Sequence, residues 1–414
     1  MTRRTRSRPA GDAGLDGLAE DYVRLALAIG RHDGDLVDAY FGPEEWRRRE
    51  SRGRPASVPR LLERARDLLA RLRSAAPTER RLFLETQTVA AEALLRRLAG
   101  EAMSLREEAR LLFDIDLPVR GTDELGLHLS RAEALLPGRG EFAARVKAFR
   151  DRFIIPPGRL KTVAQACLAE ARARSAAVLP LPAGERLRLA LVHGKPWRAY
   201  NWYRGGFQSL VEVNADLSFH LGSLMVTIFH EGYPGHHAHH SVIEKELVRG
   251  KGWLEASILL LHSPQVLIAE GVANAGLQVL LNEEDRVSLL RDVLAPAAGL
   301  DDRLDITLYE RLRTALKPLD EAVAEGARRL LLGEIEADDA VAFMRHYGLA
   351  EELAARRTVE FARRYRAYVF SYTTGELLVR DHVGEGPDRI DRYARLFRSL
   401  PTPSALASGR QKGR

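Results

Sequence analysis

The sequence predicts a mainly α-helical protein with a small β-sheet, and three observations support this. Apolar residues recur at three- and four-residue spacing from about residue 15 to residue 176, which is the period of an amphipathic helix. Over residues 180–216 this period gives way to alternating and β-branched residues, which are typical of strands. After residue 217 the helical period returns and continues almost to the C-terminus.

The N-terminal half is predicted to be a helical scaffold. Runs such as LAEDYVRLALAIG and VPRLLERARDLLARL carry the helical period, and breaks that contain Gly or Pro separate them. Strand signals are almost absent there, and we find no repeat of constant period. The chain is predicted to form one compact unit between two disordered tails, with these parts: a basic tail 1–13, a helical region 14–178, a second region 179–402 with a sheet at 179–216 and helices at 217–402, and a tail 403–414.

The predicted sheet has its strongest strand signals at 186–192 and 209–214. Aromatic residues are frequent between Trp197 and Phe207. They are expected either to pack the sheet against the helices or to form a cleft wall.

Charge is abundant but evenly spread. Lys and Arg total 63 against 57 Asp and Glu, and only seven of the basic residues are Lys, so the basic pI of about 9.5 reflects Arg. Because Arg and Glu alternate along helical runs, they indicate solvated helix faces and not the basic stripe of a nucleic-acid-binding protein. We therefore expect no nucleic-acid partner.

Compartment signals point to the cytoplasm. The single cysteine, Cys167, excludes an intrachain disulfide and a cysteine-based zinc site, which fits a reducing compartment. The N-terminus lacks the apolar stretch of roughly 7–15 residues that a secretory signal needs. Polar residues interrupt the most apolar segment, 258–281, so it falls short of the ~18 apolar residues of a membrane span. We expect a cytoplasmic protein that does not associate with membranes.

Histidines cluster in one short segment. Five of the twelve lie in HEGYPGHHAHH, from His230 to His240, directly after an apolar segment that must be buried if it is helical. Imidazoles beside a carboxylate are the ligands that zinc prefers. In the H-E-x-x-H arrangement the first His binds the metal and the adjacent Glu polarises the attacking water, which predicts His230 as a ligand and Glu231 as general base.

The second ligand departs from that arrangement. Position 234 is Pro, and the next imidazoles are His236 and His237. Residues six or seven apart cannot chelate one ion from a regular helix, but Pro234 and Gly235 favour a sharp bend that could return either ring towards His230. We favour His236 as the ligand, with His237 as a hydrogen-bond donor behind the site or to the transition state; which ring binds stays open.

Glu270 is the candidate third protein ligand. It lies 34 residues after His236 in the apolar segment LIAEGVANAGL. An ionised carboxylate among such neighbours costs several kcal/mol unless it meets a cation or several donors. The alternative is a surface Glu on an amphipathic helix.

These motifs carry a family resemblance. HEGYPGHH followed by AEGVA resembles the signature of a bacterial domain-of-unknown-function family with an HExxPGHH motif, grouped with zincin metallopeptidases of the gluzincin type. Val272 stands where that family usually has Trp, and its C-terminal Tyr-x-x-Gly stretch is matched by Tyr372 to Gly375. The segment YNWYRGGFQSLVEVNAD also resembles a branch of the family, so the similarity spans most of the chain.

The resemblance implies a helical zincin-like metallopeptidase fold with a small sheet near the active-site helix. It implies one zinc per chain, or another divalent metal, and a peptide or small amide substrate. Strand 209–214 takes the place of the zincin strand to which an extended substrate adds by backbone hydrogen bonds. Tyr372, in the Tyr-x-x-Gly match, leads the candidates for stabilising the oxyanion, before Tyr368 and Arg366.

Two other functions remain open at this point. One is a structural or non-catalytic metal-binding helical protein, with a closed site of His230, His236, His237 and Glu270. The other is a basic helical interaction module that binds polyanions.

Overall fold

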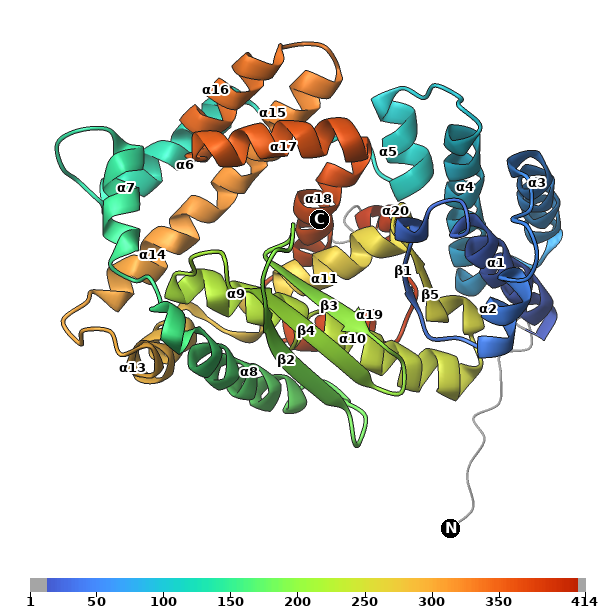
Figure 1. Cartoon of the computed structure of the whole chain (residues 1–414), viewed down its shortest axis with the longest axis horizontal. Helices are drawn as coiled ribbons and strands as arrows, with labels where there is room; N and C mark the ends of the chain where they lie inside the picture. The colour runs from blue at the N-terminus through green and yellow to red at the C-terminus, as the bar shows by residue number, and fades with distance from the viewer. Residues whose placement is uncertain (1–12, 409–414) are drawn as a thin grey trace.

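The computed structural model describes residues 13–408, and it confirms a mainly helical protein with small sheets (Figure 1). The helices of the first half are α1 (Asp16–Ile29), α2 (Glu44–Glu50), α3 (Val58–Ser74), α4 (Glu79–Leu98), α5 (Leu105–Phe113), α6 (Thr122–Leu135), α7 (Phe142–Asp151) and α8 (Leu160–Ala176). Those of the second half are α9 (Leu221–Glu231), α10 (His236–Ile243), α11 (Pro264–Leu280), α12 (Glu283–Ser288), α13 (Ala295–Ala298), α14 (Ile306–Leu316), α15 (Asp320–Leu331), α16 (Ala337–Gly348), α17 (Glu352–Tyr365), α18 (Ser371–Val383), α19 (Arg389–Leu396) and α20 (Pro403–Ser408).

A three-stranded sheet lies beside α9 and α10. It consists of β2 (Arg186–Val192), β3 (Ala199–Tyr203) and β4 (Gln208–Asn214) in the order β2-β4-β3, with β2 parallel and β3 antiparallel to β4. The strands predicted at 186–192 and 209–214 are confirmed. However, β4 is paired on both sides, so the expectation that 209–214 offers a free edge is wrong. The strand that contacts both α9 and α10 from the edge of the sheet is β3.

A second, two-stranded sheet was not predicted. In it β1 (Val37–Tyr40) pairs antiparallel with β5 (Ile258–Leu260). Regions 14–178 and 217–402 are therefore not purely helical. The pairing brings the N-terminal region against the segment that leads directly into α11.

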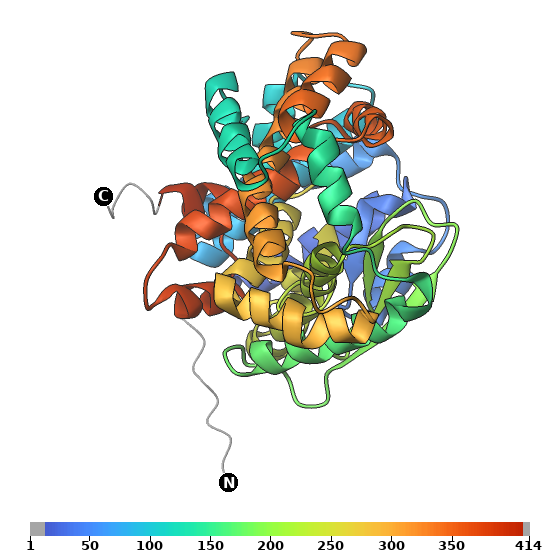
Figure 2. The same ribbon diagram turned by 90° about the vertical axis from the view of Figure 1, so that its left-hand side faces the viewer.

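Helix α11 passes through the middle of the molecule (Figures 1 and 2). Nearly all of its residues are buried, within one hydrophobic core that extends from Leu15 to Leu406. It crosses α18 so closely that a Cβ added at Gly271 would lie 2.2 Å from the carbonyl oxygen of Gly375. Glycines at the crossing therefore let the two backbones touch, which fixes Glu270 relative to Tyr372.

The prediction that the C-terminal tail 403–414 is disordered is wrong for residues 403–408. Residues 403–408 form α20, where Leu406 is buried and the Asp114 carboxylate accepts a hydrogen bond from the Ser404 amide. The predicted tail segments 1–12 and 409–414 lie outside the described residues. Within residues 13–408, no helix has the length and apolarity that crossing a lipid bilayer requires.

Candidate metal centre

The bend predicted at Pro234 and Gly235 is present. Helix α9 ends at Glu231, the Tyr233–Pro234 peptide is cis, and α10 begins at His236. The Gly235 amide donates to the Phe229 carbonyl at 3.0 Å, which folds the start of α10 back onto the end of α9. A Cβ on residue 235 would lie 1.7 Å from the His230 carbonyl oxygen, so only glycine fits there.

This bend brings His230, His236 and Glu270 together. The Nε2 atoms of the two imidazoles are 3.1 Å apart. The Glu270 carboxylate lies 3.5 Å from His230 Nε2 and 3.6 Å from His236 Nε2. One ligand atom from each residue lies within 4.8 Å of the other two, as one shared ion requires.

Asn274 orients the first of these imidazoles. Its Oδ1 lies 2.9 Å from His230 Nδ1, while its Nδ2 donates to the Tyr372 carbonyl at 3.1 Å. Because the amide is held with its oxygen towards His230, Nδ1 carries the proton and the Nε2 lone pair faces the cluster. Sequence analysis did not identify Asn274, although it lies one helical turn after Glu270 on the same face of α11.

Truncation of this amide is expected to weaken metal binding. In Asn274→Ala, His230 loses the acceptor that fixes its ring, so zinc affinity is expected to fall by about 10- to 100-fold. Competition with a chromophoric chelator measures the change. Asn282→Ala is the control, because Asn282 only caps α12 through the Asp285 amide and its loss should leave zinc affinity unchanged.

Three carboxyl groups crowd this site without a paired cation in the described part of the chain. Burial, followed by the charge of Asp38, raises the pKa of Glu231 to about 8. Burial, followed by the charges of Glu231 and Asp38, raises the pKa of Glu270 well above its usual range. Glu270 Oε2 is buried and has no hydrogen-bond partner among residues 13–408. A bound cation would relieve these costs, so the residues present fit a metal ion.

The imidazoles are in the form that binds metal. Burial lowers the pKa of His230 to about 4, and it lowers that of His236 well below the usual range, so both rings are neutral near pH 7.

Asp38 is a site residue that sequence analysis missed. It lies on β1, accepts a hydrogen bond from the Tyr200 hydroxyl, and acts electrostatically on both Glu231 and Glu270. The signal for Asp38 that the sequence offered was an acidic residue within the short segment VDAY. On β3, next to Tyr200, the Asn201 side chain donates to the Glu231 carbonyl at 2.5 Å and ties the edge strand to the end of α9.

The structure places His237 behind the bend and away from the cluster. Its ring is fully buried, with Nδ1 2.8 Å from Ser209 Oγ and Nε2 2.9 Å from Glu185 Oε2. Glu185 also accepts a hydrogen bond from Tyr233 and pairs with Arg172. His237 therefore braces the bend from behind, and the closed site of four ligands is not formed.

Tyr372 lies next to the cluster at the start of α18. The residue as a whole is 39% exposed, and its hydroxyl is 3.3 Å from that of Tyr368. Desolvation of the phenol by the surrounding protein, followed by the charge of Glu270, raises its pKa. The phenol therefore stays protonated and is able to donate to a substrate. Arg366 is directed elsewhere, because its guanidinium pairs with buried Glu108 at 2.7 Å.

A buried histidine outside the cluster is expected to make the stability of the protein sensitive to acid. His262 packs between Phe113 and Tyr368 with its Nδ1 unpartnered, and burial, followed by the charge of Arg97, lowers its pKa to about 3. Below about pH 6.5 the unfolded chain therefore takes up a proton that the folded protein does not, and stability falls until about pH 3.

His262→Leu is expected to remove this contribution. Relative to the variant, the wild type should lose about 2 kcal/mol of unfolding free energy between pH 7 and pH 5. Urea unfolding at the two pH values measures the difference. Replacement of exposed His346 by Leu is the control, and an equal pH dependence in wild type and His262→Leu would contradict this account.

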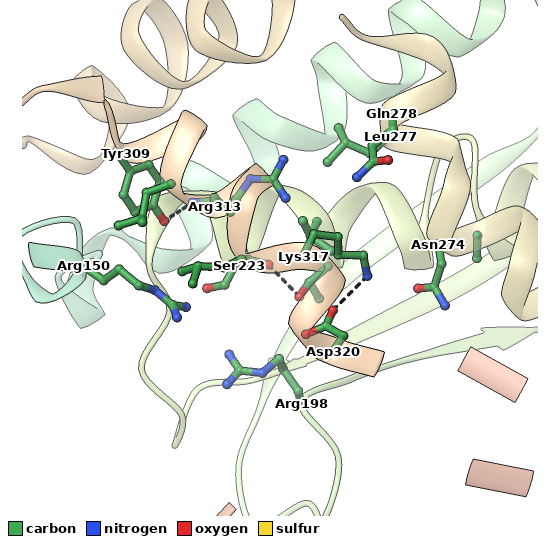
Figure 3. Close-up of a pocket in the computed structure, with 16 residues that line it drawn as sticks. Arg150, Arg198, Ser223, Asn274, Leu277, Gln278, Tyr309, Arg313, Lys317 and Asp320 are labelled. Carbon is green, nitrogen blue, oxygen red and sulfur yellow. Dashed lines mark hydrogen bonds and ion pairs between the residues drawn. The ribbon is translucent and has the colours of Figure 1, made fainter. Parts of the chain in front are cut away.

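A pocket adjoins the cluster of His230, His236 and Glu270. It has a volume of about 460 Å³ and is lined mainly by residues of α7, α9, α11 and α14 (Figure 3). Arg198, just before β3, and Lys317 and Asp320, after α14, complete its wall. Asn274 is part of its wall, so the amide that holds His230 also faces the pocket.

Comparison with known proteins informs the fold alone. No protein-family model matches the sequence, and the comparison with curated proteins likewise finds no match. Among solved structures, the chain is similar to one described as "the crystal structure of the putative lipoprotein from Colwellia psychrerythraea", with a TM-score of 0.53 and 15% identity. The match covers 86% of this chain and 67% of that one.

Proposed function

We propose that this protein is a zincin-like, zinc-dependent hydrolase that cleaves peptide or other amide bonds. The observation that carries the proposal is the convergence of His230, His236 and Glu270 within 4.8 Å, next to Glu231. Two imidazoles and one carboxylate are the protein ligands of a catalytic zinc site, which leaves a position open for water or substrate. A closed structural site would need a fourth protein ligand, and His237 points away.

Zinc held there would lower the pKa of water to about 7 and polarise a carbonyl oxygen. Glu231 accepts a proton from the attacking water and passes it to the leaving amine. Water thus adds across the C–N bond, giving one carboxylic acid and one amine. Tyr372 donates a hydrogen bond to the oxygen on which negative charge develops.

The edge strand β3 is suited to pairing with an extended peptide substrate. β3 lies at the edge of the sheet, and Asn201 anchors it to the active-site helix. A peptide that pairs with this edge would pass along the end of α9.

The proposal is tested by digestion of a peptide library with the zinc-loaded protein. We expect cleavage that stops on addition of a chelator and resumes on addition of zinc. Cleavage that persists in the chelated, metal-free protein would refute metal-dependent hydrolysis. Bound zinc with no cleavage of any peptide or amide would favour a non-catalytic metal protein.

A further inference from the structure

The pocket beside the metal centre continues along the same helix faces that carry the ligands. On α9, three pocket residues precede His230 at helical spacing and share its face of the helix: Ser223, Val226 and Thr227. On α11, three pocket residues follow Glu270 at helical spacing and share its face of the helix: Ala273, Asn274 and Leu277. A substrate bound at the metal centre therefore has this pocket as the continuation of its site.

Basic side chains outnumber acidic ones in the wall of the pocket. Its lining contains four cations and one carboxylate: Arg150, Arg198, Arg313, Lys317 and Asp320. Two of the cations are neutralised, because Arg313 pairs with Glu310 at 2.6 Å, and Lys317 pairs with Asp320 at 3.0 Å and with Glu376 at 2.9 Å.

Arg150 and Arg198 remain without a carboxylate partner among residues 13–408. Asp151, next to Arg150 on α7, is taken by Lys147 at 2.7 Å. The Arg198 guanidinium lies 3.4 Å from the Ser218 carbonyl oxygen and over the face of the Phe219 ring. The surrounding protein and the charge of Arg150 lower the pKa of Arg198, as expected for two cations held close together.

In Figure 3 these two guanidinium groups lie at one end of the pocket and Asn274 lies at the other, with Lys317 between them. A concave site with two unpaired guanidinium groups is suited to a carboxylate, which they bind with charge-assisted hydrogen bonds.

Two independent backbone paths indicate the scale of the span between the pocket and the cluster of His230, His236 and Glu270. Ser223, in the pocket, precedes His230 by seven residues, which is about 10 Å of helix axis. Arg198 precedes Asn201, which contacts Glu231, by three residues, which is about 10 Å of extended chain. An extended peptide covers this distance with about three residues.

We propose, on the basis of the hydrolase function above, that Arg150 and Arg198 bind a carboxylate of the substrate. The preferred substrates are then short anionic peptides, cleaved about three residues from that carboxylate. The group is either the C-terminal carboxylate or an acidic side chain, since both present the same chemistry to the two guanidinium groups.

Matched peptides distinguish these sources. N-acetylated alanine hexapeptides are compared with a free C-terminus, with an amidated C-terminus, and with the amidated form carrying one internal Glu or Gln. We expect that loss of the recognised carboxylate raises KM by about 10- to 100-fold in the wild type. In the Arg150→Gln/Arg198→Gln variant the same loss should change KM less than twofold. Arg106, an exposed residue of α5 outside the pocket wall, supplies the control Arg106→Gln, which should keep the preference.

Calorimetric binding of the same peptides to Glu231→Gln protein gives a readout that needs no turnover. One outcome is that peptides bind only when they carry the carboxylate, that Arg150→Gln/Arg198→Gln abolishes this binding, and that no peptide is hydrolysed. This outcome would support the carboxylate site and refute the proposed enzyme. Hydrolysis and binding with equal affinity for acid and amide forms would support the enzyme and overturn the carboxylate site. The Arg150→Lys/Arg198→Lys variant, which keeps both charges, should retain a preference for anionic peptides, and loss of that preference in this correctly folded variant would also count against the site.

Discussion

Replacement of Glu231 by Gln is expected to lower the hydrolysis rate by about 10²- to 10⁴-fold while the protein still binds one zinc per chain. The amide keeps the size of the side chain but cannot accept the proton of the attacking water. Glu231 is not among the three residues whose ligand atoms converge, so metal binding should persist. Steady-state rates and metal analysis of the same preparation measure both quantities.

Glu283→Gln is the control for this change, because Glu283 is an exposed residue at the start of α12. It should leave both rate and zinc content unchanged. If Glu231→Gln hydrolyses peptides within tenfold of the wild type, another group is the base.

Gly235→Ala is expected to abolish stoichiometric zinc binding and to lower the free energy of unfolding by about 3 kcal/mol. The added methyl group would lie 1.7 Å from the His230 carbonyl oxygen and 2.5 Å from that of Phe229. The turn must open to relieve this clash, which separates His236 from His230. Zinc titration and urea unfolding measure the two effects.

Gly126→Ala, in α6, makes the same chemical change where nothing lies within 4 Å of the new Cβ. It should bind zinc normally and stabilise the helix by about 0.5–1 kcal/mol. Full zinc affinity in Gly235→Ala would show that the tight bend is not needed to form the site.

Local sequence chemistry was sufficient to predict the bend and the approach of His230, His236 and Glu270 that the structure has. Pro234 and Gly235 have backbone preferences that act over one or two residues. Glu270 was identifiable because an acid within an apolar run must meet a compensating charge. The strands at 186–192 and 209–214 also followed from local patterns, and the structure has them at Arg186–Val192 and Gln208–Asn214.

The remaining features depend on contacts between distant segments. The direction of the His237 ring is set by where α10 begins and by Glu185 and Ser209 on other elements. Asp38 reaches the site only because β1 pairs with β5, and each strand alone is too short to give a clear signal. The central position of β4 likewise follows from strand pairing that no single segment encodes.

The proposed hydrolase requires a common metal ion held by His230, His236 and Glu270. X-ray absorption at the zinc edge of protein with one zinc per chain reports the ligands of that ion. We expect four light-atom ligands, of which two are imidazole nitrogens at about 2.0–2.1 Å and one is a carboxylate oxygen at about 2.0–2.2 Å. A coordination shell of three or more imidazoles, or of oxygens alone, would contradict the proposal.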